Sequence, residues 1–274
     1  MTLNCNGRLI SLTSPKIMGI LNITPDSFYD GGKYKDEKSI LKQVEKMLTS
    51  GATFLDIGAY SSRPGAAEVS ESTELMRILP IVHLVLKEFP ESVLSIDTFR
   101  SKVAEECVQA GAAIVNDISA GERDEKMLDL IAHLGVPYII MHMRGTPKTM
   151  QSKTDYTDLL RDILYYFSQR IALAKAKGIK DIIIDPGFGF AKTLTQNYEL
   201  LNQAELLHLV GHPLLIGVSR KSMIYKLLQT DASHALNGTT ALHMVALQKG
   251  AHILRVHDVQ EAMECVRLYE QLNA

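Results

Sequence analysis

The most constraining feature of the sequence is a series of eight short apolar runs, rich in valine and isoleucine. The runs occupy residues 17–21, 53–57, 93–97, 113–117, 138–142, 181–185, 214–218 and 252–256. Runs without polar alternation indicate strands that are buried on both faces of a parallel sheet. Between them lie longer segments with apolar residues three and four positions apart, such as Ile40, Val44 and Met47, which is typical of amphipathic helices. Eight strand–helix units predict an α/β fold, a single (β/α)8 TIM barrel.

The connections between the predicted elements differ at the two ends of this barrel. Gly51, Gly111, Gly135 and Gly250 each separate a predicted helix from the next strand, as a short helix-ending turn does. The segments that follow the strands are instead rich in polar residues, glycine and proline, at 24–32, 61–65, 142–147 and 186–190. Active sites of TIM barrels lie at the carboxyl ends of the strands. We therefore expect the functional site at the end that these segments form.

Length, charge and cysteine content are consistent with one intracellular barrel. The chain has 274 residues, and about 250 is typical of the fold, so we expect a single domain over residues 1–274. A net charge of −2 without blocks of like charge argues against a nucleic-acid or membrane surface. Cys5, Cys107 and Cys265 give neither a disulfide framework nor a metal-ligand spacing. With no run typical of a signal peptide or membrane span, we expect a cytoplasmic protein.

A polar residue stands at or near the end of every predicted strand. These residues are Asn22, Asp56, Asp97, Asn116, His142, Asp185, Ser219 with Lys221, and Arg255 with His257. One such residue alone is commonly the cap of the next helix. A polar residue at the end of all eight strands favours a ligand-binding site.

Two of these residues favour a heterocyclic ligand. Asp185 follows an apolar run and precedes Pro186, so its carboxylate faces the barrel mouth and suits a ligand edge with two adjacent N–H donors. Asn116 offers a donor and an acceptor together, which fits a mixed heterocycle edge. The alternatives are a salt bridge to a lysine for Asp185 and a turn for Asn116.

The end of the last strand favours an anion. Arg255 and His257 are two positions apart, so they point to one face and together suit a phosphate. The habitual phosphate site of the barrel lies near the loops after strands seven and eight. Residues 219–222, Ser-Arg-Lys-Ser, open a predicted helix there and would add amides and cations, unless they are simply a solvated basic helix start. We expect this anion corner to be distinct from the ring pocket.

Other catalytic signatures are missing from the sequence. Residues 187–189 lack the third glycine of a dinucleotide fingerprint, and there is no P-loop, HExxH or GxSxG motif. We therefore do not expect a zinc or nucleotide enzyme.

The sequence resembles dihydropteroate synthase nearly from end to end. The matching motifs lie at 18–28 (MGILNITPDSF), 62–67 (SRPGAA), 95–98 (SIDT), 115–118 (VNDI), 141–150 (MHMRGTPKTM), 185–190 (DPGFGF), 219–222 (SRKS) and 255–258 (RVHD). The resemblance implies an enzyme of folate synthesis, which joins p-aminobenzoate to a dihydropterin diphosphate and releases diphosphate.

The resemblance also implies a role for individual residues. The pterin is expected at Asp97, Asn116, Asp185 and Lys221, and the diphosphate at Asn22, Arg63, Arg255 and His257. The p-aminobenzoate pocket is expected at Phe28, Ser62, Arg63, Pro64 and Lys221. Asn22 is the expected protein ligand of Mg²⁺, and Asp97, Lys221, Arg255 and His257 are the expected catalytic residues. The family further suggests a homodimer formed through helices late in the chain.

One segment departs from the family pattern. With the register through Arg63 kept, the segment that ends in Ala59-Tyr60-Ser61-Ser62 stands where many members carry Gly-Gly-Glu-Ser-Thr before Arg-Pro, so Tyr60 replaces an acid while Ser62 keeps a hydroxyl. The change affects the aminobenzoate side of the expected site. Two alternatives remain: a folate-binding methyltransferase of corrinoid pathways, and a pterin-binding paralogue without catalytic activity.

The expected reaction is a substitution at the exocyclic methylene of the pterin. An aniline nitrogen is unprotonated near neutral pH, so stabilising the leaving diphosphate matters more than a general base. Mg²⁺, Arg255, His257 and Arg63 would neutralise the leaving group, while Asp97 would stabilise cationic character on the pterin. The loops at 23–35 and 58–70 have few apolar anchors, so we expect them to be mobile and to form the aminobenzoate pocket only after diphosphate binds.

Overall fold

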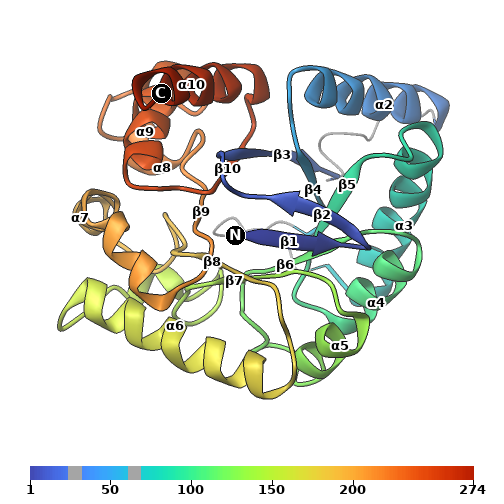
Figure 1. The fold of residues 1–274 in the computed structure, drawn as a ribbon, viewed down its shortest axis with the longest axis horizontal. Coiled ribbons are helices and arrows are strands. Elements are labelled where there is room, and N and C mark those ends of the chain that lie inside the picture. The colour runs from blue at the N-terminus through green and yellow to red at the C-terminus, as the bar shows by residue number, and fades with distance from the viewer. Residues whose placement is uncertain (24–32, 61–68) are drawn as a thin grey trace.

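The computed structural model describes residues 1–23, 33–60 and 69–274, and its centre is a barrel of parallel strands (Figure 1). The strands, in chain order, are β3 (Lys16–Asn22), β4 (Phe54–Gly58), β5 (Val93–Asp97), β6 (Ile114–Asp117), β7 (Tyr138–Met141), β8 (Ile182–Asp185), β9 (Leu215–Ile216) and β10 (Ile253–Val256). Their order in the sheet is β8-β7-β6-β5-β4-β3-β10-β9. A parallel bridge between Ile184 and Leu214 joins β8 to the start of β9. The predicted (β/α)8 barrel is confirmed.

Helices surround this barrel as a ring (Figure 1). They are α2 (Lys33–Thr49), α3 (Glu71–Glu88), α4 (Ser101–Gln109), α5 (Met127–Leu134), α6 (Leu159–Ala176), α7 (Leu194–Asn202), α8 (Ser222–Tyr225), α9 (Leu236–Gln248) and α10 (Val259–Leu272), with 3-10 turns η1 (Met150–Ser152) and η2 (Ala204–Val210). The helices lie against the outward-facing strand residues, as α6 does with buried Ile163, Phe167 and Ile171. Among the described helices, none has the length and apolar character needed to cross a membrane.

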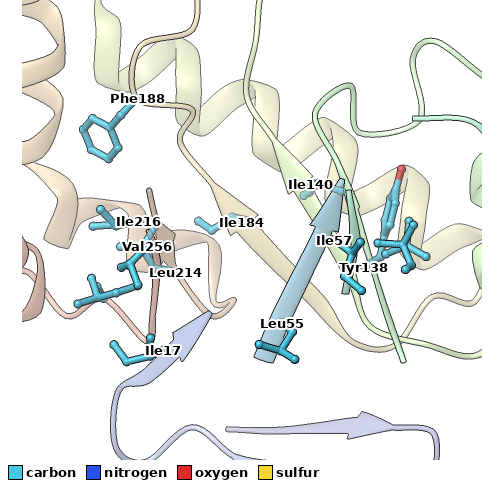
Figure 2. Close-up of a cluster of buried hydrophobic side chains, with 14 of the residues drawn as sticks. Ile17, Leu55, Ile57, Tyr138, Ile140, Ile184, Phe188, Leu214, Ile216 and Val256 are labelled. Atoms are coloured by element: carbon cyan, nitrogen blue, oxygen red, sulfur yellow. The ribbon is translucent and has the colours of Figure 1, made fainter. Parts of the chain in front are cut away.

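The strand side chains alternate between two apolar layers. Leu55, Ile57, Ile140 and Ile184 belong to the large core between the barrel and the helices, part of which Figure 2 shows. The neighbouring positions point into the barrel, because successive side chains of a strand face opposite sides. At the amino ends of the strands the inward residues are apolar: Met18, Phe54, Val93, Ile114, Ile139, Ile183, Leu215 and Ile253. The interior of the barrel is therefore a packed core at this end.

An N-terminal hairpin covers the same end of the barrel. Strands β1 (Thr2–Cys5) and β2 (Arg8–Ser11) pair antiparallel, and in Figure 1 they lie across the middle of the helix ring. Leu3 and Ile10 pack in one cluster with the inward residues at the amino ends of the strands. Asn6 and Gly7 both have positive φ, 51° and 83°, as the two-residue turn of a tight hairpin requires. Our sequence analysis did not predict this hairpin.

Candidate active site

The inward positions change from apolar to polar at the carboxyl ends of the strands. Two residues after Phe54, Ile114 and Ile183, the same faces carry Asp56, Asn116 and Asp185. Arg255 follows Ile253 in the same way, and Asp97 ends β5. The strands therefore bring most of the predicted polar residues together at the expected end of the barrel.

Arg255 is the centre of this polar layer. Its Nε donates to Oδ2 of Asp56 at 2.6 Å, and its Nη2 donates to Oδ2 of Asp97 at 2.7 Å. Asp56 is completely buried and also accepts from Ser95 Oγ at 2.6 Å and Asn116 Nδ2 at 3.0 Å. Leaving such a buried carboxylate without its cation is costly, so Arg255 is both an anchor of the layer and a charged group facing the barrel mouth.

Within this network, Asp97 is the carboxylate whose charged form is clearly disfavoured. Burial raises the pKa of Asp97 to about 7, the Arg255 guanidinium opposes the shift, and Asp56 adds to it. For Arg255, burial favours the neutral form but the two carboxylates outweigh it and raise its pKa. Burial therefore favours the protonated form of Asp97, whereas its two carboxylate partners keep Arg255 cationic.

Arg255 also links two regions that the sequence analysis treated as distinct. Arg255 was assigned to the anion corner and Asp97 to the ring pocket, yet the two side chains form one ion pair. The separation of an anion corner from a ring pocket stays a prediction, and Arg255 is the residue at which the two regions adjoin. Inward side chains of a closed barrel meet near its axis, so Arg255 of β10 reaches carboxylates of β4 and β5.

Asp185 lies at the end of β8, where the backbone turns sharply. Its Oδ1 accepts from the backbone N–H of Gly187 at 2.8 Å. Burial raises the pKa of Asp185, while Lys221 is the strongest opposing charge. The carboxylate is thus held in place by its own loop and faces a nearby cation.

Lys221 reaches this region from the loop before α8. Its Nζ donates to the carbonyl oxygen of Phe188 and lies 5.1 Å from the ring centre of Phe190. Burial lowers the pKa of Lys221 to about 8, partly opposed by Asp185. Lys221 is thus the main cation facing Asp185, although the hydrogen bond of its ammonium goes to the Phe188 carbonyl.

The predicted basic turn at 219–222 divides into two parts. Ser219 Oγ contacts His257, accepting from its backbone N–H at 3.1 Å and lying 3.2 Å from its Nδ1. Arg220 instead binds Asp258 through Nε at 2.7 Å and Nη2 at 2.8 Å, and donates to the carbonyls of Ala232 and Ser233. Arg220 therefore acts as a clamp that joins the turn to Asp258 and to the segment before α9.

The remaining predicted site residues lie at or beyond the edge of the described structure. Asn22 ends β3, is exposed, and pairs in register with Gly58 of β4. Phe28, Ser62, Arg63 and Pro64 fall in 24–32 and 61–68, outside the described residues. Tyr60, where the family pattern has an acid, packs edge-on against Phe99 with ring centres 5.2 Å apart.

Two residues of the site escaped the sequence analysis. Asp56 stood among the strand-end residues but was given no role, because its partner Arg255 is 199 residues away. Lys192 had no sequence signal, since an isolated lysine is usually a surface residue. In the structure it is buried and contacts His142 and the loop after β8.

Comparison with known proteins agrees with this geometry. The pterin binding enzyme family matches residues 18–257. The dihydropteroate synthase of Escherichia coli is 43% identical over 272 residues, 98% of this chain and 96% of that protein. The Synechocystis dihydropteroate synthase is 44% identical over 259 residues, 93% of this chain and 89% of that protein.

Solved structures give the same result. The dihydropteroate synthase of Yersinia pestis with a sulfonamide drug has a TM-score of 0.93 at 42% identity, covering 100% of this chain and 99% of that one. The enzyme of Xanthomonas albilineans with 7,8-dihydropteroate has a TM-score of 0.90 at 34% identity, covering 100% and 99%. These relatives favour dihydropteroate synthesis over methyl transfer. The chain belongs to the family of pterin-binding enzymes and, within it, to the dihydropteroate synthases.

Proposed function

We propose that the chain condenses p-aminobenzoate with 6-hydroxymethyl-7,8-dihydropterin diphosphate, giving 7,8-dihydropteroate and diphosphate. The observation that carries this is the polar layer of Asp56, Asp97, Asn116, Asp185 and Arg255, which faces one mouth of an otherwise apolar barrel. The enzyme is a transferase: the aniline nitrogen attacks the methylene carbon, and the carbon–oxygen bond breaks with its electron pair leaving on diphosphate. The nitrogen then loses a proton.

The pterin is bound by the proposed set Asp97, Asn116, Asp185 and Lys221. An ionised Asp185 accepts from two adjacent N–H groups, which matches the amino and ring N–H edge of a pterin. Asn116 donates to Asp56 through Nδ2, which leaves its carbonyl oxygen to accept from the ring. Lys221 donates to acceptors on the opposite edge, and the Phe190 ring beneath it keeps the ammonium in place.

The diphosphate is bound by Arg255 and His257, with Arg63 as a further cation from outside the described residues. His257 lies beside Ser219, so the loops after β9 and β10 form one corner. Arg255 also pairs with Asp97. We propose that the Asp97 carboxylate lies on the pterin side of this pair, where it stabilises positive charge that develops on the pterin. The same guanidinium therefore serves the leaving group and the pterin.

Mg²⁺ is the proposed cofactor. Within the described residues there is no cluster of three or more His, Cys, Asp or Glu side chains able to hold a metal. A site with the exposed Asn22 as its protein ligand, completed by diphosphate and water, fits the preference of Mg²⁺ for oxygen and for its own waters. Bound there, the ion would supply positive charge to the leaving diphosphate.

The aminobenzoate pocket is proposed at Phe28, Ser62, Arg63, Pro64 and Lys221, and only Lys221 lies in the described structure. We expect ordered binding, in which diphosphate and pterin enable p-aminobenzoate to bind. Titrating p-aminobenzoate with and without Mg²⁺, diphosphate and pterin tests the order, and Arg63→Ala should abolish the difference. Equal affinity in both titrations would show that the pocket is preformed.

Assembly and location complete the proposal. We propose one domain over residues 1–274 that forms a homodimer through its late helices, because Leu268 and Leu272 of α10 are exposed apolar side chains. A cytoplasmic location fits three buried cysteines that are free thiols.

The direct test is to mix the enzyme with Mg²⁺, the dihydropterin diphosphate and p-aminobenzoate. We expect dihydropteroate and diphosphate to appear in equal amounts. Binding of both substrates without product would instead identify the paralogue without catalytic activity and contradict the proposal.

A further inference from the structure

The side chain of Lys192 is buried behind the candidate site, with 3% of the residue exposed. Its Nζ lies 3.1 Å from Nδ1 of His142 and donates to the carbonyl oxygens of Gly187 and Phe190 at 3.0 Å each. An ammonium group has three N–H donors. Within the described structure, the three donors of Lys192 therefore each have an acceptor.

Two of these acceptors belong to residues 186–190, the loop after β8. The site side of the same loop carries the groups proposed to hold the pterin: Gly187 N–H bonds Asp185, the Phe188 carbonyl accepts from Lys221, and the Phe190 ring lies beneath Lys221. The loop is thus tied to Asp185 and Lys221 on one side and to Lys192 on the other. A change at Lys192 would reach both pterin ligands through the backbone.

The third acceptor, His142, fixes where the ammonium lies. His142 is 2% exposed, and burial lowers the pKa of its ring well below the usual value, with Lys192 adding to the shift. A neutral imidazole has one acceptor nitrogen. The His142 ring is held edge-on against Tyr166, with ring centres 4.9 Å apart.

Backbone contact adds a second constraint on the loop. Gly187 has a φ of +68°, and a Cβ at this position would overlap the carbonyl oxygen of His142. Gly189 N–H is held by Asn197 Oδ1 of α7 at 2.6 Å. The loop therefore lies between β7 and α7, with the Lys192 ammonium where its carbonyls converge.

We propose that Lys192 is a positioning residue for the pterin half of the site, whose buried ammonium holds residues 186–190 in the conformation that aligns Asp185 and Lys221. The inference rests on the proposed function, because it assumes that Asp185 and Lys221 bind the pterin. Removing the ammonium leaves two buried carbonyls and one imidazole nitrogen without their donor, so the loop must shift. Burial lowers the pKa of Lys192 to about 7, and in its protonated form Lys192 adds to Lys221 in lowering the pKa of Asp185, which favours the ionised form that accepts pterin N–H groups.

The test compares two ligands in Lys192→Met, a variant of similar length without charge. Affinity for 6-hydroxymethylpterin, measured by calorimetry, should fall about tenfold or more, the usual scale for buried polar groups that lose a partner. Affinity for inorganic diphosphate with Mg²⁺ should be unchanged, because the proposed diphosphate ligands Arg255 and His257 lie on β10 and directly after it, and not on residues 186–190. An equal loss for both ligands would indicate general damage, and no loss for either would remove Lys192 from the site; both results overturn the proposal.

Two further variants keep the test decisive. His142→Phe retains a ring against Tyr166 but removes one acceptor, so it should weaken pterin binding in the same selective way by a smaller factor, even if Lys192→Met fails to fold. Lys249→Met removes a lysine paired with Glu205 far from the site and should change neither affinity. If wild type itself does not bind the pterin, the proposed function fails; if wild type binds it and His142→Phe binds equally well, the Lys192 proposal alone fails.

Discussion

The two ends of the barrel are built from the same strands but differ in role: one is an apolar core and the other carries the candidate active site. At the amino end, the inward residues are apolar and pack under the N-terminal hairpin. At the carboxyl end, two residues further along, they are polar: Asp56, Asn116 and Arg255 are joined by hydrogen bonds, and Asp185 is held by the loop after β8. The difference shows that one end stabilises the strands and thereby holds charged groups close together at the other.

The largest expected effect on activity is at Arg255, because it belongs to the polar layer and faces the proposed substrate site. Arg255→Met leaves buried Asp56 without its cation, which should lower the free energy of unfolding by about 3 kcal/mol. Activity should fall at least about a hundredfold, as when a donor to developing negative charge is lost. Denaturant unfolding and steady-state kinetics measure the two effects.

A double variant separates these two roles of Arg255. Arg255→Met leaves both Asp56 and Asp97 without their cation, and adding Asp56→Asn removes one of these two charges, so stability should recover in part while activity stays low. Recovery of both would show that Arg255 acts only as an anchor.

A cavity at the amino end of the barrel should lower stability and leave catalysis unchanged. Phe54→Ala removes a fully buried ring from the apolar core at the amino ends of the strands and should lower the free energy of unfolding by about 3–5 kcal/mol. The kcat of the folded fraction at low temperature should match wild type, because Phe54 lies at the other end of its strand from the site. A large fall in kcat without loss of stability would contradict the assignment of a purely stabilising role to the amino end.

The pH dependence of kcat/KM should report the ionisation of two residues at the carboxyl end of the barrel, Asp97 and Lys221. With the pKa of Asp97 at about 7 and that of Lys221 at about 8, kcat/KM should rise through about 7, where Asp97 ionises, and fall through about 8, where Lys221 loses its charge. Asp97→Asn should flatten the acid limb and keep the alkaline one. An unchanged acid limb in this variant would assign it to another group.

The free energy of unfolding should depend on the protonation of Asp97 in the opposite sense to activity. The folded-state pKa is above the ordinary value of about 3.9, so protonated Asp97 favours folding. Its contribution is fully present below about pH 4 and is lost as the pH rises through about 7. Protonated Asp97 and Asn both lack a charge, so the unfolding free energies of wild type and Asp97→Asn should converge at low pH. A difference that persists there would show that the contact with Arg255 contributes by itself.

The smallest expected effect is at the clamp that Arg220 forms with Asp258. Asp258→Asn weakens the paired hydrogen bonds of Arg220, with both side chains about one-fifth exposed, and should cost about 1 kcal/mol of stability. KM for the dihydropterin diphosphate should rise by a small factor while kcat changes little. A loss of kcat as large as that of Arg255→Met would mean that Arg220 contacts the substrate.

Periodicity predicted the barrel well because burial on both faces selects apolar residues directly. The run at 214–218 became a strand of only two residues, Leu215 and Ile216, between Pro213 and Gly217. The hairpin was missed because its strands are short, although Asn6-Gly7 is a strong signal for a two-residue turn.

The site was predictable in its residue types but not in its pairings. Strand ends identified Asp97, Asn116, Asp185 and Arg255, since one sheet edge collects them. The pairing of Arg255 with Asp56 depends on barrel closure across 199 residues, and no local spacing encodes it. Lys192 was invisible for a related reason: its acceptors are backbone carbonyls, which have no sequence identity.

The most direct test of the central claim is calorimetry on Asp185→Asn with three ligands. We expect 6-hydroxymethylpterin and its dihydropterin diphosphate both to bind at least about 2 kcal/mol more weakly, because an NH₂ group replaces a needed acceptor. Inorganic diphosphate with Mg²⁺ should bind as it does to wild type. Unchanged affinity for the pterin would contradict the account, because Asp185 would then lie outside the pterin pocket.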